Sequence, residues 1–220
     1  MANAIEKVNT IAIADIEKVN TLTDDNIEKL NTLEFTGTPA DAHTLISTHT
    51  LSSTYELNIT SGIDSTYDVY EFVWINVHPS DNNTHLTFQV NAAGQSGFNE
   101  TIMSTWWWAG HEESDGSTFL NYSAGFDQQQ GTAYNNLAID VGSDSDEATS
   151  GSLILYAPSS TTYVKHFLAR ASLSHSANYA IDNNVAGYIN TTAAIDEISF
   201  RYDAGGNMDS GVIKMYGIAK

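Results

Sequence analysis

The chain has 220 residues, of which 41% are hydrophobic, so it holds enough apolar side chain to bury a core. It carries 27 acidic and 8 basic residues, and its formal net charge is −19. This charge repels phosphate groups, so we expect no nucleic-acid binding and no docking on anionic membranes. The sequence contains no run of 18 apolar residues, so we predict no membrane-spanning helix.

The absence of cysteine excludes disulfides and thiolate metal sites and fits a protein assembled in a reducing cytoplasm. The first residues show no basic segment followed by an apolar run, so we predict no signal peptide. Between Lys29 and Lys165 there is no lysine or arginine. The acidic surface either keeps the protein soluble in salty surroundings or collects divalent cations or a basic partner.

Residues 1–35 contain an eleven-residue repeat, with "IEKVNT" at 5–10 and 16–21 and "IEKLNT" at 27–32. We interpret each unit as one helical turn that breaks at an asparagine and continues into a short extended piece. A coiled coil of eleven-residue repeats and disorder are the alternatives. A unit of this size cannot bury its own apolar stripe, so we predict an arm that anchors the protein or joins copies of it. The apolar positions of the arm are Ile5, Val8, Ile11, Ile16, Val19, Leu22, Ile27, Leu30 and Leu33.

Residues 36–220 show the alternating pattern of β-strands after a break at Gly37 and Pro39. We predict no amphipathic helix in this region and expect a hairpin loop at residues 203–211. This many short strands predict an all-β fold, namely a jelly-roll-like antiparallel β-sandwich. The predicted strands cover residues 53–60, 67–77, 85–91, 118–124, 151–157, 163–171, 197–203 and 211–218.

Both ends of the chain resemble structural proteins of tailed-phage virions. The run from Ser210 to Ile218, "SGVIKMYGI", is similar to the last strand of jelly-roll domains in those proteins. The N-terminal units resemble their "I-x-K-[IV]-N-G-V" repeats, with Thr10, Thr21 and Thr32 in the place of glycine. The resemblance implies a virion protein of the tail-fibre, spike or head-decoration type that is assembled in the host cytoplasm.

The same resemblance implies the partners of the chain. Its arm would contact other virion proteins of the capsid or tail, and its sandwich would form a homotrimer and contact a host-surface glycan. The first alternative function is a capsid decoration protein that stabilises the shell without binding a receptor. A glycan depolymerase is the second, although we expect no enzyme, because the chain has no G-x-S-x-G, P-loop or H-E-x-x-H motif.

The run "TWWWAGHEESDGS" holds the candidate glycan-binding residues, which are Trp106, Trp107, Trp108 and nearby Tyr122. In a strand, Trp106 and Trp108 share one face and Trp107 takes the other. One face belongs to the core, and the other could stack on sugar rings. The alternative is that all three tryptophans fill the sandwich.

Acidic loops and scattered histidines give no metal motif, so we expect no metal and no cofactor. The acidic loops could hold a hard cation, but solvated loops are the simpler interpretation. The histidine spacings do not fix a metal geometry. The residues in question are His111, Glu112, Glu113, Asp115, Asp140, Asp144, Asp146 and Glu147 in the loops, and the histidines at 43, 49, 78, 85, 166 and 175.

Overall fold

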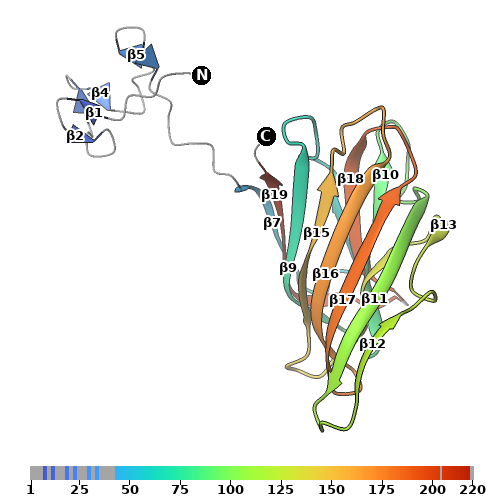
Figure 1. The fold of residues 1–220 in the computed structure, drawn as a ribbon. Coiled ribbons are helices and arrows are strands. Elements are labelled where there is room, and N and C mark those ends of the chain that lie inside the picture. Colours follow the sequence, from blue (N-terminus) through green and yellow to red (C-terminus); the bar gives the residue numbers. More distant parts are fainter. Residues whose placement is uncertain are drawn as a thin grey trace. The chain divides into compact units, whose positions relative to one another are not determined.

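The computed structural model describes the backbone of six short strands between residues 7 and 34, and all of residues 43–203 and 205–218. The chain divides into two compact units, residues 1–42 and residues 43–220. Every element in the described part is a β-strand (Figure 1), so the predicted all-β, jelly-roll-like antiparallel fold is confirmed. None of the described residues forms a helix that is long and apolar enough to cross a membrane.

The first unit contains three separate two-stranded antiparallel sheets, one in each repeat. The predicted helical turn and the coiled coil are therefore both wrong for the strand residues. In each repeat only Asn-Thr lies between the paired apolar positions, and asparagine favours the left-handed conformation of a tight hairpin turn as readily as that of a helix end. The strands are β1 (Lys7–Val8), β2 (Ile11–Ala12), β3 (Lys18–Val19), β4 (Leu22–Thr23), β5 (Lys29–Leu30) and β6 (Leu33–Glu34).

Six of the predicted anchoring residues lie in these strands, and they pair as Val8 with Ile11, Val19 with Leu22 and Leu30 with Leu33. The other three, Ile5, Ile16 and Ile27, lie outside the described residues. Anchoring by this segment stays a prediction.

The second unit is a sandwich of two layers, and all of its strand pairs are antiparallel. We call the larger layer the front sheet. It has the order β7-β19-β9-β15-β16-β17-β11, with β12 and β13 both paired to β11. These strands are β7 (His43–Thr50), β9 (Val69–Pro79), β11 (Ile102–Glu112), β12 (Thr118–Tyr122), β13 (Gln129–Gly131), β15 (Thr149–Tyr156), β16 (Lys165–His175), β17 (Tyr179–Ile189) and β19 (Met208–Ile218).

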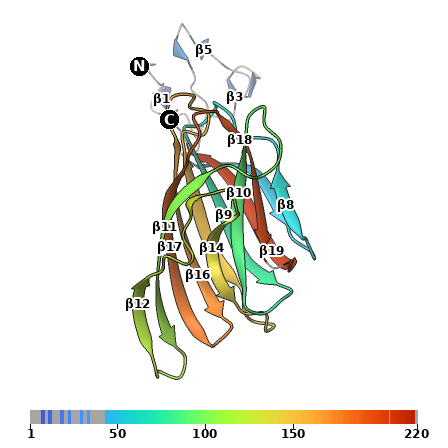
Figure 2. The same ribbon diagram turned by 90° about the vertical axis from the view of Figure 1, so that its right-hand side faces the viewer.

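The smaller layer, the back sheet, has the order β14-β10-β18-β8. Its strands are β8 (Glu56–Ile59), β10 (Thr84–Ala92), β14 (Asn135–Val141) and β18 (Ile195–Tyr202). Figure 2 shows the two layers from the side. They meet along one seam, where Val141 of β14 pairs with His175 of β16.

The core lies between the layers because inward side chains on both sheets are apolar. On the front sheet Phe72, Trp74 and Phe167 are buried, and on the back sheet Phe88 and Phe200 face them. Phe72 packs on Phe200 with ring centroids 5.8 Å apart, and Phe88 packs on Phe167 at 5.1 Å. Such aromatic pairs between the two sheets bury large apolar areas and help to set the distance between the sheets.

The predicted hairpin at residues 203–211 is wrong. β18 belongs to the back sheet and β19 to the front sheet, so this segment crosses between layers. Gly205 has a φ of 91°, as a turn residue does, but β19 already begins at Met208. A short glycine-rich connection permits a change of layer as readily as a return along the same sheet.

The outward side of the back sheet is covered by the chain itself. Gln89 of β10 is fully buried, and its side-chain amide donates hydrogen bonds to the carbonyl oxygens of Glu100 (2.9 Å), Thr132 (3.2 Å) and Ala133 (3.1 Å). The segments that carry these carbonyls therefore lie over β10. The outward side of the front sheet, which we call the outer face, carries the open hollows described next.

Candidate functional site

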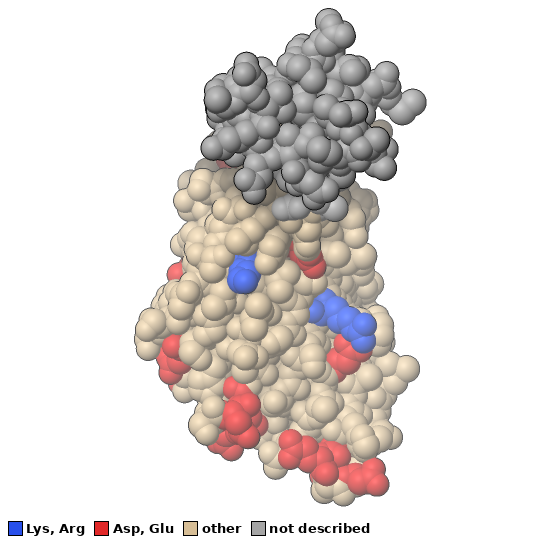
Figure 3. Space-filling model, turned by 90° about the vertical axis from the view of Figure 1, so that its left-hand side faces the viewer, with Lys and Arg blue, Asp and Glu red and all other residues tan. Residues whose placement is uncertain are grey.

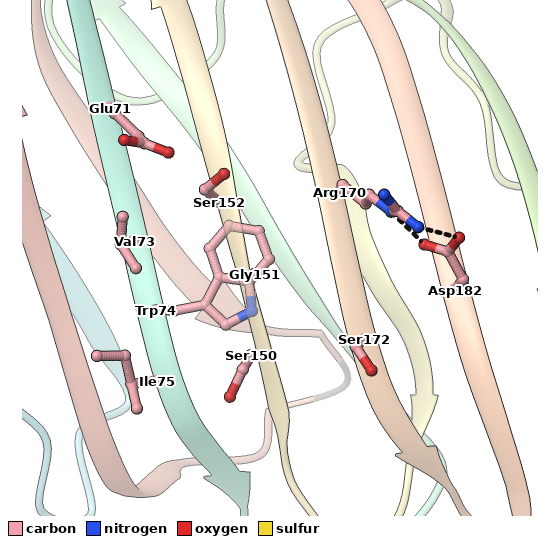
Figure 4. A pocket seen from close by; sticks show the side chains of 10 residues that line it. All are labelled: Glu71, Val73, Trp74, Ile75, Ser150, Gly151, Ser152, Arg170, Ser172 and Asp182. Carbon is pink, nitrogen blue, oxygen red and sulfur yellow. Dashed lines mark hydrogen bonds and ion pairs between the residues drawn. The ribbon is translucent and has the colours of Figure 1, made fainter. Parts of the chain in front are cut away.

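The outer face of the front sheet is the candidate functional site because shallow, open hollows lie side by side on it. One of them, about 620 Å³ in volume, lies over β9, β15, β16 and β17. Figure 4 shows the small side chains Ser150, Ser152 and Ser172 at this hollow. Small residues on neighbouring strands leave room that larger ones would fill, so the strand sequences themselves create the depression.

Gly151 is required beneath this hollow. A Cβ added there would lie 2.3 Å from the carbonyl oxygen of Arg170 and 2.6 Å from the ring of Trp74. Real Cβ atoms do not approach other atoms so closely, so no other residue fits without a shift of the backbone. The glycine lets the indole of Trp74 pack directly under the β15 backbone.

One row of outward residues crosses the whole outer face. It runs strand by strand, so its members share a face of the sheet. The strand register places Tyr122, Trp107, Asn184, Arg170, Ser152, Val73, Lys214 and Thr48 side by side in this order. The row therefore begins with two aromatic side chains and continues with an amide, a guanidinium and a hydroxyl group.

The three tryptophans of β11 divide between the faces as the alternation predicts. Trp107 points outward with 41% of its surface exposed, whereas Trp106 is completely buried. Trp108 is partly buried and packs on the core side against Phe119, with ring centroids 4.5 Å apart. The assignment of Trp106 to a glycan site is therefore wrong, because no ligand at the surface can reach it, and Trp108 belongs to the core cluster.

Trp107 and Tyr122 lie opposite each other on β11 and β12, and we call them the aromatic pair. Tyr122 is exposed, and its hydroxyl donates a hydrogen bond to the carboxylate of Asp127. This bond raises the pKa of Tyr122 and fixes the direction of the hydroxyl. The aromatic pair thus offers two aromatic side chains at the margin of the outer face.

A bidentate ion pair lies two strands from Trp107. The Nε and Nη2 atoms of Arg170 donate to Oδ1 and Oδ2 of Asp182 at 2.8 and 2.9 Å (Figure 4). The hydrogen bond from Arg170 lowers the pKa of Asp182, and the same bond raises that of Arg170. Both carboxylate oxygens are engaged, so Asp182 is held in the charged form and is a poor candidate for a general base.

A second hollow of about 290 Å³ joins the aromatic pair to the ion pair. Trp107, Leu168, Arg170 and Asn184 all line it. Sequence analysis identified the aromatic residues but missed Leu168, Arg170, Asp182 and Asn184. The alternation along β16 was the available signal, but the partners of Arg170 come from β17, which the sequence pattern did not predict.

The acidic loops and histidines mostly serve local structure. His111 contacts Asp115 at 2.9 Å, and the N–H of Asp144 donates to Glu147 at 2.7 Å. Within the described residues, no group of three or more histidine or carboxylate side chains is arranged to hold a metal ion.

One cluster was not predicted and lies at the seam of the sandwich. Asp140 stands between His85 and His175, with closest oxygen–nitrogen distances of 3.6 and 3.5 Å. The backbone N–H of Asp140 also donates to Nδ1 of His85 at 2.9 Å. These contacts join β10, β14 and β16 and belong to the framework of the sandwich.

The outer face therefore combines exposed aromatic surface, planar hydrogen-bonding groups and an internally neutralised ion pair. Comparisons of the chain with protein-family models, with curated proteins and with solved structures found no match.

Proposed function

We propose that this chain is a surface protein of a tailed-phage virion, that residues 1–35 attach it to the particle, and that its sandwich binds a host glycan. The virion assignment is supported by the resemblance of both ends of the chain to such proteins. The glycan assignment is supported by one observation on the outer face. Trp107 is exposed there beside Tyr122, and it borders a hollow that Asn184 and Arg170 also line.

Sugar rings have apolar faces and hydroxyl edges, so proteins bind them by stacking aromatic rings and by hydrogen bonding with planar polar groups. The hollow beside Trp107 offers both within one surface. Residues 43–218 carry 19 acidic and four basic side chains. An acidic polysaccharide would be repelled by this surface, so the proposed ligand is an uncharged glycan.

The test uses the full chain on an array of host-surface glycans and on whole host cells. We expect binding to uncharged glycans, at least tenfold weaker for Trp107→Ala. Tyr163→Ala is the matched control, because Tyr163 is an aromatic residue with 73% exposure that lies outside the front-sheet strands. This variant should bind as the original chain does.

Three results would contradict the glycan assignment: no binding to the array or to cells, equal binding by Trp107→Ala, or a preference for acidic glycans. Antibody-gold labelling of intact particles tests the virion assignment separately. Label at the tail supports attachment, whereas label spread over the head favours the decoration function. Absence of label from purified particles would end the virion proposal.

A further inference from the structure

The outer face is unusually apolar for a sheet surface in contact with water. Within the described residues, six of the eight exposed large hydrophobic side chains lie on it, and only Tyr55 and Tyr163 lie elsewhere. Antiparallel sheets that face water normally place polar residues outward. Large exposed apolar patches mark interaction surfaces. The six are Leu45, Ile75, Trp107, Leu120, Tyr122 and Leu168.

A second row on this face shows how the apolar residues join. The register places Thr105, Ala186, Leu168, Ile154, Glu71, Tyr216 and Leu45 side by side across seven strands. Leu168 is 48% exposed, and Ile75, which follows Glu71 by four residues along β9, is 41% exposed. We call Leu45, Ile75, Ile154, Leu168 and Tyr216 the central patch.

The charge of the outer face differs from that of the rest of the chain. The sandwich as a whole has almost five acidic residues for each basic one. The centre of the outer face carries two acids, Glu71 and Asp182, and two bases, Arg170 and Lys214. Glu71 lies 2.8 Å from His43, and Asp182 is paired with Arg170.

This charge balance determines what can cover the face. Two copies of an acidic protein repel each other through most of their surfaces, and association needs a surface where acids do not oppose acids. On the side drawn in Figure 3, most of the described surface is uncharged and the acidic side chains gather toward its lower end. A basic partner would instead bind where the acids gather, so the neutral patch fits another copy of this chain.

The area of the outer face is also sufficient for a stable contact between two copies. Seven strands, each about 4.8 Å wide, cover about 34 Å, and four rows of outward residues, each about 6.8 Å deep, cover about 27 Å. The flat area of the outer face is then roughly 900 Å², which is comparable to the roughly 800 Å² that each partner buries in a stable interface of ordinary size.

We propose that the central patch is the contact surface between copies of this chain. The apolar side chains of one copy pack on those of the next, and the Arg170–Asp182 ion pair stays internally neutralised in the contact. Leu168 also lines the hollow beside Trp107, so contact between copies and glycan binding compete for this hollow at the β11 margin of the outer face. The proposal does not depend on glycan binding.

The test compares Leu168→Asp with Tyr163→Asp in the full chain by sedimentation equilibrium over a wide concentration range. Both variants place a carboxylate on an exposed apolar position, but only the first lies in the central patch. We expect the original chain and Tyr163→Asp to form the same oligomer. Leu168→Asp should raise the dissociation constant at least tenfold.

A monomeric original chain overturns the proposal, and so does a Leu168→Asp variant that associates as tightly as Tyr163→Asp. Circular dichroism shows whether each variant is folded. If Leu168→Asp does not fold, covalent surface labelling of the original chain decides. Leu168 and Ile75 should become protected as the concentration rises while Tyr163 does not, and equal labelling at all concentrations refutes the contact.

Discussion

Trp106 and Trp107 are adjacent in sequence but lie on opposite sides of β11, the first fully buried and the second 41% exposed. Trp106 packs against Phe126 in the core, with ring centroids 5.1 Å apart. We expect Trp106→Ala to lower the free energy of unfolding by about 3–5 kcal/mol through lost burial and a cavity. Trp107→Ala should cost about 1 kcal/mol or less. Equal costs in urea unfolding would contradict this division of faces.

Gly211 allows β19 to approach β9. Its φ is 113°, and an added Cβ would lie 2.6 Å from the carbonyl oxygen of Asn76. Gly211→Ala therefore combines left-handed strain with a backbone clash, and we expect a loss of about 3 kcal/mol or more.

Gly94 is the matched control for that substitution. Its φ is 82°, but nothing lies within 4 Å of an added Cβ. Gly94→Ala should cost only the strain, about 1 kcal/mol. Thermal melts of the two variants separate strain from clash, and similar midpoints would show that the clash is absorbed without cost.

His85 accepts the backbone N–H of Asp140, a residue whose φ is 52°. Nδ1 is the acceptor, so the proton of the neutral ring is on Nε2, which nitrogen NMR shifts can verify. His85→Ala leaves this N–H without its acceptor, and we expect a loss of about 1–3 kcal/mol. His166→Ala, at an exposed histidine on the outer face, should change stability by less than about 0.5 kcal/mol. If both variants unfold at the same urea concentration, the His85 bond contributes nothing.

The fold class and several strands follow from local pattern. The strands predicted at residues 151–157, 163–171 and 211–218 overlap β15, β16 and β19, in which buried side chains alternate with partly buried or exposed ones. Each has one face in the core, so periodicity and burial agree. The split of the tryptophans follows from the same alternation.

β17 was missed because its sequence contains Asp182, Asn183, Asn184 and Gly187, which favour turns. In the structure it pairs along its whole length with β11 and with β16. The backbone hydrogen bonds of these two long strand pairings outweigh the weak preference of the β17 sequence for turns. Because β17 supplies Asp182 and Asn184, half of the candidate site depends on pairing between segments far apart in sequence, which periodicity cannot reveal.

The Arg170–Asp182 pair predicts a change in stability at acid pH. The bond lowers the pKa of Asp182 below its usual 3.8, so its contribution to stability is present above that value. The contribution is lost as the pH falls through the lowered pKa of the folded state. Below pH 4 the original chain should therefore lose stability more steeply than Asp182→Asn. Arg170→Gln should flatten the same window, and parallel curves for all three proteins would refute the assignment.

The buried Tyr202 leads us to predict a loss of stability at alkaline pH. It is buried on β18, and its hydroxyl donates to the carbonyl oxygen of Val77 at 2.9 Å, which links the back sheet to β9 of the front sheet. Burial raises its pKa well above the usual 10.0. Its contribution to stability is therefore complete below pH 10 and is lost as the pH rises toward the raised value.

Tyr202→Phe should cost about 1 kcal/mol at neutral pH, from the lost hydrogen bond. Above pH 10 the variant should lose stability less steeply than the original chain. Burial also raises the pKa of Tyr70 and Tyr134, but both are present in both proteins and so cancel in the difference. Urea unfolding from pH 7 to pH 11 measures the effect. A constant difference across that range would mean that Tyr202 titrates alike in the folded and unfolded chains.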